Sequence, residues 1–187
     1  MKRISIFVSG NGTNLQRIAE YFKSNSNIEI VNVVCNNPKA YAIERAKNLG
    51  IPVRMVNRQE FNSIEFIQEM VSLKLDLIVL AGFLWKIPAS LIQAYPKKIV
   101  NIHPALLPKY GGKGFYGEHV HEAVVAAKEV FSGITIHYVN EVYDNGEIIL
   151  QAYTKLDSDE TPDSLAAKIH KLEQAYFPVA IEQVLMD

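Results

Sequence analysis

The chain has 187 residues, of which nearly half are apolar, and a formal net charge of −1. A chain of this length can bury one sizeable hydrophobic core, so we expect one compact domain spanning residues 1–187. The near-neutral charge argues against the broad basic surface that binds a nucleic-acid backbone, so we expect small-molecule partners and no nucleic acid.

The sequence also argues against a membrane protein and against a disulfide-stabilised fold. Its first residues lead directly into a short alternating run, RISIFV, and no apolar stretch reaches the ~18 residues that a spanning helix needs. Cys35 is the single cysteine and lies in the apolar stretch VNVVCNN, which predicts a buried thiol without a role. We therefore expect a cytoplasmic protein.

Strand-like runs alternate with helix-like segments through the first half of the chain. Strands are predicted at 4–8, 30–35, 52–55, 75–81 and 99–103, and helices at 14–22, 41–49 and 64–73. Strands that alternate with helices form a parallel sheet with crossover helices. Residues 1–103 are therefore predicted to form a nucleotide-binding βαβ half.

Residues 104–187 are predicted to hold a flap loop, a β-hairpin and a long C-terminal helix. The strand-like runs GITIHYV and EIILQAY are joined by NEVYDNG, whose Asn145-Gly146 pair is a strong turn signal and predicts antiparallel pairing. Thr161-Pro162-Asp163 is a helix-start signal for the last segment. The expected fold class is α/β: a mostly parallel Rossmann-like sheet flanked by helices, with a late antiparallel strand pair.

The first loop with chemical character is VSGNGTNLQ, after the first strand. Ligands of open α/β sheets collect beyond the carboxyl ends of strands. Gly10 and Gly12 end this strand and a helix opens at Thr13 or Asn14, so backbone N–H groups can face an anion. Leu15 stands where a dinucleotide-binding fingerprint needs a third glycine. Two interpretations remain, a site for one phosphate and an ordinary tight turn, and this stretch alone favours neither.

The second loop is DLIVLAGFLWKIP, which follows a continuously apolar strand typical of the centre of a parallel sheet. Gly82 permits close backbone approach, and Phe83, Leu84, Trp85 and Ile87 offer flat apolar surface at the strand's end. A heteroaromatic ligand would fit such a surface, and a satellite hydrophobic cluster under a loop is the alternative.

The third loop begins with NIHP. Asn101 and His103 are two residues apart on a strand, so their side chains point to the same side, and Pro104 ends the strand. An amide can donate a hydrogen bond to a developing oxyanion, and a histidine can add charge or a proton if a carboxylate raises its pKa. Asp144 is the best candidate for that carboxylate. A structural histidine bonded to backbone is the alternative for His103.

The remaining histidines do not form a convincing metal site. No pair among His119, His121, His137 and His170 has the short spacing with a carboxylate that is typical of zinc ligands, so no metal is predicted. His119 and His121 are assigned to the start of a helix, and His137 to a strand face. Ser9 lies outside any Gly-x-Ser-x-Gly elbow, which argues against a serine nucleophile.

Four motifs together resemble one enzyme family. SGNGTNL, LAGF, NIHPALLPKYGG and DNGEIILQ, in this order, are similar to the phosphoribosylglycinamide formyltransferases, and the resemblance covers nearly the whole chain. It implies a formyltransferase fold and an enzyme of purine biosynthesis. The implied reaction transfers a formyl group from 10-formyltetrahydrofolate to the amine of N1-(5-phosphoribosyl)glycinamide, without a metal. A monomer or homodimer is expected.

The resemblance also implies roles for individual residues. It assigns catalysis to Asn101, His103 and Asp144. The positions implied to bind phosphoribosylglycinamide are Gly12, Thr13, Asn14, His170 and Glu173. The positions implied to bind folate are Arg58, Leu84, Trp85, Lys86, Ile87, Asn101 and Asn140.

Two departures from the family pattern concern the flap and the folate pocket. The segment GGKGFYGEHVHEA after PKY is longer than in many relatives, and its glycines predict a mobile flap. Trp85 and Lys86 stand where Arg-Ile is common. Leu107-Pro108 is a candidate for a cis peptide bond.

Three other functions compete with this interpretation. A formyltetrahydrofolate hydrolase would use the same three groups with water as the nucleophile, and usually carries an additional N-terminal regulatory domain. A methionyl-tRNA formyltransferase would need a basic C-terminal RNA-binding domain. A non-catalytic folate- or nucleotide-binding module could share the fold, although it would have no need for the catalytic trio.

Overall fold

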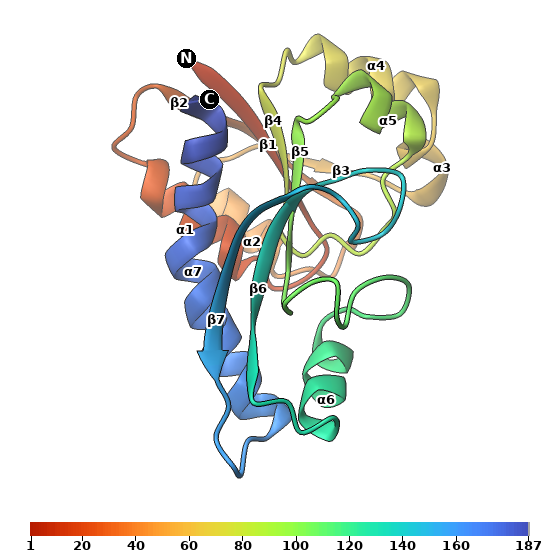
Figure 1. Ribbon diagram of the computed structural model, residues 1–187. Helices are drawn as coiled ribbons and strands as arrows, with labels where there is room; N and C mark the ends of the chain where they lie inside the picture. Colours follow the sequence, from red (N-terminus) through yellow and green to blue (C-terminus); the bar gives the residue numbers. More distant parts are fainter. Residues whose placement is uncertain (187) are drawn as a thin grey trace.

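A computed structural model describes residues 1–186 as a single α/β domain built around one seven-stranded sheet (Figure 1). The strand order is β3-β2-β1-β4-β5-β6-β7. The strands are β1 Lys2–Val8, β2 Ile28–Cys35, β3 Val53–Met55, β4 Leu77–Leu80, β5 Ile99–His103, β6 Phe131–Tyr138 and β7 Ile148–Lys155. Each strand predicted from the sequence is present, with ends displaced by a few residues.

Two kinds of pairing divide the sheet. The first five strands pair in parallel. The β5–β6 and β6–β7 pairs are antiparallel. This confirms the expected fold class and the late antiparallel pair. Because β1, β4 and β5 pair in parallel, their carboxyl ends lie together at one edge, where a ligand site is expected.

Helices cover both faces of the sheet (Figure 1). They are α1 Thr13–Phe22, α2 Ala42–Asn48, α3 Arg58–Phe61, α4 Ile64–Ser72, α5 Ala89–Ala94, α6 Glu118–Ala126 and α7 Pro162–Met186. α1, α2 and α7 pack on one face, and α3, α4 and α5 on the other. β1 shows why both faces are covered, because its successive side chains Ile6 and Phe7 enter opposite cores.

The periodicity did not predict the short helices α3 and α5. α3 has only four residues and depends on a cap: the Asn57 side chain accepts hydrogen bonds from Gln59 and Glu60 N–H, and the Glu60 side chain accepts from Asn57 N–H. Helices of this length do not complete two turns of apolar spacing. The signal for α3 lies in its cap and not in a period, whereas no side chain caps α5.

The long helix α7 begins where the sequence indicated. Thr161 caps it, with its hydroxyl oxygen accepting from Ser164 N–H at 3.1 Å, and Pro162 is the first helical residue. Leu165 and Ile169 are buried against the sheet. No helix within residues 1–186 combines the length and apolar character that membrane crossing requires.

The connections near the third loop also match their predictions. The Leu107-Pro108 peptide bond, a candidate from the sequence, is cis. β6 and β7 are joined by residues 139–147, and Gly146 packs so closely on the Tyr138 carbonyl that a side chain there would overlap it. The turn signal Asn145-Gly146 therefore lies at the end of a nine-residue connection that also carries Asp144.

Candidate active site

A cavity of about 480 Å³ lies at the carboxyl ends of β1, β4 and β5. The glycine-rich flap at 112–117 and the β6–β7 connection complete its walls. Most residues singled out from the sequence line it: Gly12, Thr13, Asn14, Leu84, Trp85, Lys86, Ile87, Asn101, His103, Asn140, Asp144 and Glu173. Two do not, namely Arg58 and His170, which lie just behind its walls.

Asn101 lies near the centre of the cavity on β5, and its amide orientation is fixed. Its Nδ2 lies 3.1 Å from His137 Nε2. His137 Nδ1 lies 2.8 Å from the Tyr138 backbone oxygen, which can only accept, so the ring carries its proton on Nδ1 and Nε2 accepts from Asn101. Because an amide nitrogen has two hydrogens, the second N–H of Asn101 is left for a ligand oxygen.

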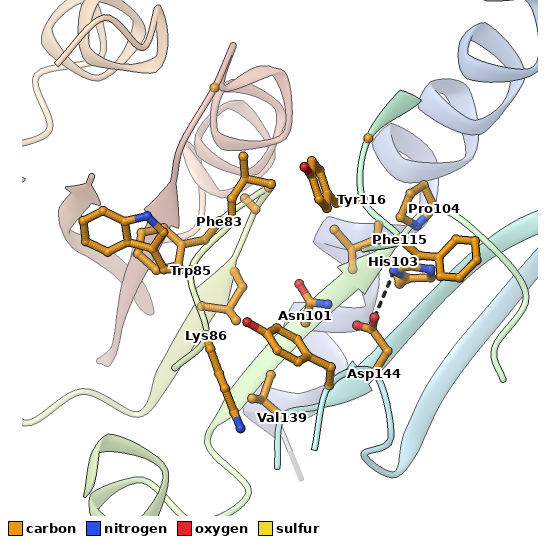
Figure 2. A pocket seen from close by; sticks show the side chains of 18 of the residues that line it. Phe83, Trp85, Lys86, Asn101, His103, Pro104, Phe115, Tyr116, Val139 and Asp144 are labelled. Atoms are coloured by element: carbon orange, nitrogen blue, oxygen red, sulfur yellow. Dashed lines mark ion pairs between the residues drawn. The ribbon is translucent and has the colours of Figure 1, made fainter. Parts of the chain in front are cut away.

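His103, at the end of β5, is almost completely buried. Its Nε2 lies 2.7 Å from the backbone oxygen of Tyr110, so Nε2 is the donor and carries a proton. The other ring nitrogen, Nδ1, faces Asp144, with 3.7 Å between Nδ1 and Oδ2 (Figure 2). In the neutral ring Nδ1 therefore holds the lone pair, and a proton gained there would be stabilised by the carboxylate.

Asp144 is held in place from two sides. Its backbone has a left-handed φ of 51°, and its Oδ2 accepts a hydrogen bond of 2.9 Å from the N–H of Gly112 in the flap. Oδ1 lies 3.7 Å from His137 Nε2. Burial raises the pKa of Asp144, whereas the nearby His103 and the hydrogen bond from Gly112 N–H lower it, and the net shift is downward. The carboxylate is therefore ionised at neutral pH.

The expectation that Asp144 raises the pKa of His103 above its ordinary value is wrong for the net shift. Burial lowers the pKa of His103, and the Asp144 charge and the Tyr110 carbonyl raise it by less. The ring is only 4% exposed, a depth that the sequence did not reveal. The imidazole is consequently neutral at pH 7.

The first turn forms the opposite end of the cavity. Gly12 precedes α1 with φ 78°, and a Cβ at this position would lie 2.6 Å from the Ala42 Cβ, so both its backbone and its packing require glycine. No side chain caps the first turn of α1. Its N-terminal N–H groups are therefore available to an anionic ligand.

Glu173 on α7 closes this end. Asn14 Nδ2 donates to Glu173 Oε2 at 3.0 Å, and His170 Nδ1 lies 3.5 Å from the same oxygen. The Glu173 contact raises the pKa of His170, although burial opposes it. His170 Nε2 in turn contacts Gln174 Nε2 at 2.9 Å. His170 thus supports Glu173 from behind the wall.

An aromatic wall faces Asn101, His103 and Asp144 across the cavity (Figure 2). Trp85 packs against Phe61 and Phe83, with ring centroids 5.6 and 6.1 Å apart. Arg58 lies over the Trp85 ring at 4.7 Å, and the Lys86 ammonium lies 5.6 Å from the Tyr143 ring. Arg58 and Lys86 both line a neighbouring hollow of about 430 Å³.

Asn140 is engaged in the β6–β7 connection. Its Nδ2 donates to the Asn145 backbone oxygen at 3.1 Å, and its Oδ1 accepts from Val142 N–H at 2.9 Å. Its side chain therefore shapes the loop that carries Asp144, and the residue also lines the cavity.

Sequence reasoning missed the importance of His137, which it assigned only to a strand face. His137 pairs directly with Asn101 across the β5–β6 ladder. Antiparallel partners share a face, so an alignment of the two strands would have placed both side chains at the site. His121 on α6 also lines the cavity, and burial lowers its pKa.

Within the described residues there is no group of three or more His, Cys, Asp and Glu side chains arranged to hold a metal ion. Asn101, His103 and Asp144 are instead paired with other side chains or with backbone, whereas Asn14 Oδ1 and His121 Nδ1 are buried without a hydrogen-bond partner among the described residues. The arrangement offers a fixed amide donor, a neutral imidazole and an ionised carboxylate around one space, which suits chemistry at a carbonyl group.

Comparison with known proteins gives consistent matches. The formyl transferase family matches residues 2–181. The chain is 39% identical over 186 residues to a chloroplastic phosphoribosylglycinamide formyltransferase of Arabidopsis thaliana, covering 95% of this chain and 64% of the plant protein. The chain thus spans less than two thirds of the plant relative. It is 37% identical to phosphoribosylglycinamide formyltransferase of Bacillus subtilis, with 99% and 95% of the two chains covered.

A solved structure agrees with these matches. The crystal structure of phosphoribosylglycinamide formyltransferase from Anaplasma phagocytophilum superimposes with a TM-score of 0.89 and 33% sequence identity. The match covers 100% of this chain and 88% of that one. The alignment therefore extends over the whole length of this chain.

Proposed function

The chain belongs to the formyl transferase family, and from this premise we propose that it transfers the formyl group of 10-formyltetrahydrofolate to the amine of N1-(5-phosphoribosyl)glycinamide. The products are the formylglycinamide ribonucleotide and tetrahydrofolate, in purine biosynthesis. The observation that carries the proposal is the meeting of Asn101, His103 and Asp144 between an uncapped helix N-terminus and an aromatic wall. One end suits a phosphate and the other a flat heteroaromatic ring.

Asn101 stabilises the negative charge that develops on the formyl oxygen. Its free N–H points into the cavity because His137 holds the other one. A donor fixed in advance needs no reorganisation when the carbonyl carbon becomes tetrahedral. His137 is therefore a positioning residue for Asn101.

His103 moves the proton that formyl transfer requires. The neutral ring accepts at Nδ1 the proton that the attacking amine loses, directly or through a water, and then gives it to the departing folate nitrogen. This order replaces the expectation of a ring charged from the start, because burial keeps His103 neutral. One proton leaves the amine and one reaches the folate, so the transfer balances without a covalent enzyme intermediate.

Asp144 stabilises the imidazolium while it exists. It is ionised at neutral pH and lies 3.7 Å from His103 Nδ1, so it favours the proton on that atom. Gly112 N–H fixes the carboxylate from the flap. The position of the flap therefore affects the proton transfer, because the flap holds the carboxylate that stabilises the imidazolium.

The two substrates enter from opposite ends. The N–H groups at Gly12, Thr13 and Asn14 bind the phosphate, and Glu173, supported by His170, binds the ribose. On this assignment residues 1–103 provide the phosphate-binding turn and most of the aromatic wall. Residues 104–187 provide the flap, the hairpin and the ribose-binding helix.

The folate ring lies along the aromatic wall of Leu84, Trp85 and Ile87, near Asn140. Trp85 and Lys86 stand where the family resemblance implies an Arg-Ile pair. Here Trp85 stacks on Arg58 instead, which leaves the Arg58 guanidinium facing the neighbouring hollow. Arg58 and Lys86 are thus placed to bind the acidic part of the folate.

For partners and compartment we propose small molecules only, no nucleic acid and no metal, in the cytoplasm as a monomer or homodimer. The buried, free thiol of Cys35 suits a reducing compartment.

One assay separates the proposal from its alternatives. The protein is mixed with 10-formyltetrahydrofolate with and without glycinamide ribonucleotide, and release of tetrahydrofolate is followed by absorbance. Release that requires the amine supports transfer. Release without the amine indicates a hydrolase, and absence of release under both conditions indicates a binding module.

A further inference from the structure

Arg45 on α2 holds the first turn from behind the cavity. Its Nε donates to the Asn11 backbone oxygen at 3.0 Å, and its Nη2 donates to Asn11 Oδ1 at 2.8 Å. Its Nη1 donates to Gln16 Oε1 on α1. One guanidinium therefore ties the turn to the first helix, with several bonds in a fixed planar geometry.

The α2 backbone reinforces this contact. The N–H of Ala42 donates to the Gly10 oxygen at 3.1 Å, and Ala42 is the neighbour that leaves no room for a side chain at Gly12. The Arg45 Cδ lies 3.5 Å from the position of a Gly12 Cβ. The turn that presents N–H groups to the cavity is thus shaped by α2 as much as by its own glycines.

The positive charge of Arg45 is not neutralised by a carboxylate. Its hydrogen-bond acceptors are amide oxygens, and its guanidinium lies 5.0 Å from the centre of the Tyr41 ring. In the part of the chain that the structure describes, no Asp or Glu oxygen lies within 4.0 Å of it, whereas Arg54 pairs with Glu69. The charge therefore remains available to an anion at the turn.

The Arg45 charge also acts on His170, which lies behind the cavity wall. Glu173 raises the pKa of His170 on α7, and the Arg45 charge opposes that rise, which places Arg45 within electrostatic range of the residues that flank the turn. Arg45 and the N-terminus of α1 therefore add positive potential at the same end of the cavity.

We infer that Arg45 is a positioning residue for the phosphate of the nucleotide substrate, shaping the Gly10–Gly12 turn through Asn11 and contributing an unpaired positive charge. This inference rests on the proposed function, since it concerns the phosphate end of the same site. No residue assignment made from the sequence included α2, because the arginine approaches the turn from a different helix.

The test measures binding, not catalysis. Isothermal titration gives the dissociation constants of glycinamide ribonucleotide and of its dephosphorylated nucleoside for wild type, Arg45→Gln and Arg45→Lys. Lys47→Gln is the matched control, because it removes one positive charge from the same helix and Lys47 contacts only Glu44 at the surface. Thermal unfolding of each variant and titration of a folate analogue report on general damage.

Arg45→Gln is expected to weaken binding of the nucleotide by about ten-fold or more, with less than about two-fold change for the nucleoside and for the folate analogue. Nucleotide binding by wild type should weaken more steeply with salt than binding by Arg45→Gln, because one charge is missing. Arg45→Lys should lie between them, since it keeps the charge and loses the planar bonds to Asn11. Lys47→Gln should resemble wild type.

The inference is overturned if Arg45→Gln binds the nucleotide within two-fold of wild type, or if nucleotide, nucleoside and folate analogue all weaken together. If Arg45→Gln does not fold, Arg45→Lys decides by the same comparison. Failure of wild type itself to bind glycinamide ribonucleotide would refute the proposed function, which keeps the two failures distinct.

Discussion

Thr135 provides a quantitative test of how the strand pair β6–β7 holds the third loop. Its hydroxyl is fully buried; it donates to the Ala105 oxygen at 2.7 Å and accepts from Leu107 N–H at 3.0 Å. It also accepts from Gln151 Nε2 at 2.9 Å. Thr135→Val keeps the shape and removes the hydroxyl, so two backbone groups of a buried loop lose their partner.

The expected cost follows from those two groups. A buried donor or acceptor left without a partner costs about 1–3 kcal/mol, so we expect Thr135→Val to lower the free energy of unfolding by about 2–6 kcal/mol. In a chain of this size that corresponds to a fall in Tm of about 4–24 °C. Turnover should fall too, because the same loop leads to Tyr110, whose backbone oxygen holds His103.

Urea unfolding monitored by circular dichroism gives the measurement, with an unchanged slope showing that the same surface is exposed. Ser132→Ala is the matched control, because Ser132 lies on the same strand and its buried hydroxyl has no hydrogen-bond partner among residues 1–186. It should be neutral or slightly stabilising, and Thr135→Ser should stay near wild type. If Thr135→Val unfolds within about 0.5 kcal/mol of wild type, the hydroxyl does not hold the loop.

Three further predictions concern the active site. Asn101→Ala and His103→Ala should each lower turnover by about 100-fold or more at saturating substrate while remaining folded, since each removes a polar group next to the reacting carbonyl; turnover near wild type would contradict their roles. Burial lowers the pKa values of His103 and His121, so the unfolded chain binds more protons than the folded chain below about pH 6.5. The free energy of unfolding should therefore fall as the pH is lowered from about 7.5 to about 5.5. The raised pKa of His170 opposes this fall without reversing it. His121→Gln should weaken that pH dependence, and equal slopes in urea titrations would refute the argument. Gly12→Ala should abolish measurable binding of glycinamide ribonucleotide, because the new Cβ meets Ala42 and φ is left-handed; unchanged affinity by calorimetry would show that the turn is not the phosphate site.

The sequence predicted the architecture well because its strongest signals are local. Apolar runs, the Thr161-Pro162 helix start and the Asn145-Gly146 turn each indicate one element without knowledge of the rest. The alternation of strands and helices then implies parallel pairing. Hydrophobic periodicity did not predict the short helix α3, because this helix depends on a capping interaction between Asn57 and Glu60.

The sequence could predict only those site residues that stand within recognisable motifs. Asn101, His103 and Asp144 stand in recognisable stretches, and the structure brings them together. His137 and Arg45 act through pairing between elements far apart in sequence, so no local pattern marks them. The direction of the His103 pKa shift was wrong for a related reason, because burial depends on the whole packed loop.

The most direct test of the account follows the formyl carbon itself. 10-Formyltetrahydrofolate labelled with ¹³C in the formyl group is incubated with the protein and glycinamide ribonucleotide, and the label is traced by NMR. We expect the label to appear in the formamide of the ribonucleotide product in an amount equal to the tetrahydrofolate formed. Label recovered as formate, or left on the folate, would contradict the claim that Asn101, His103 and Asp144 direct the formyl group to an amine.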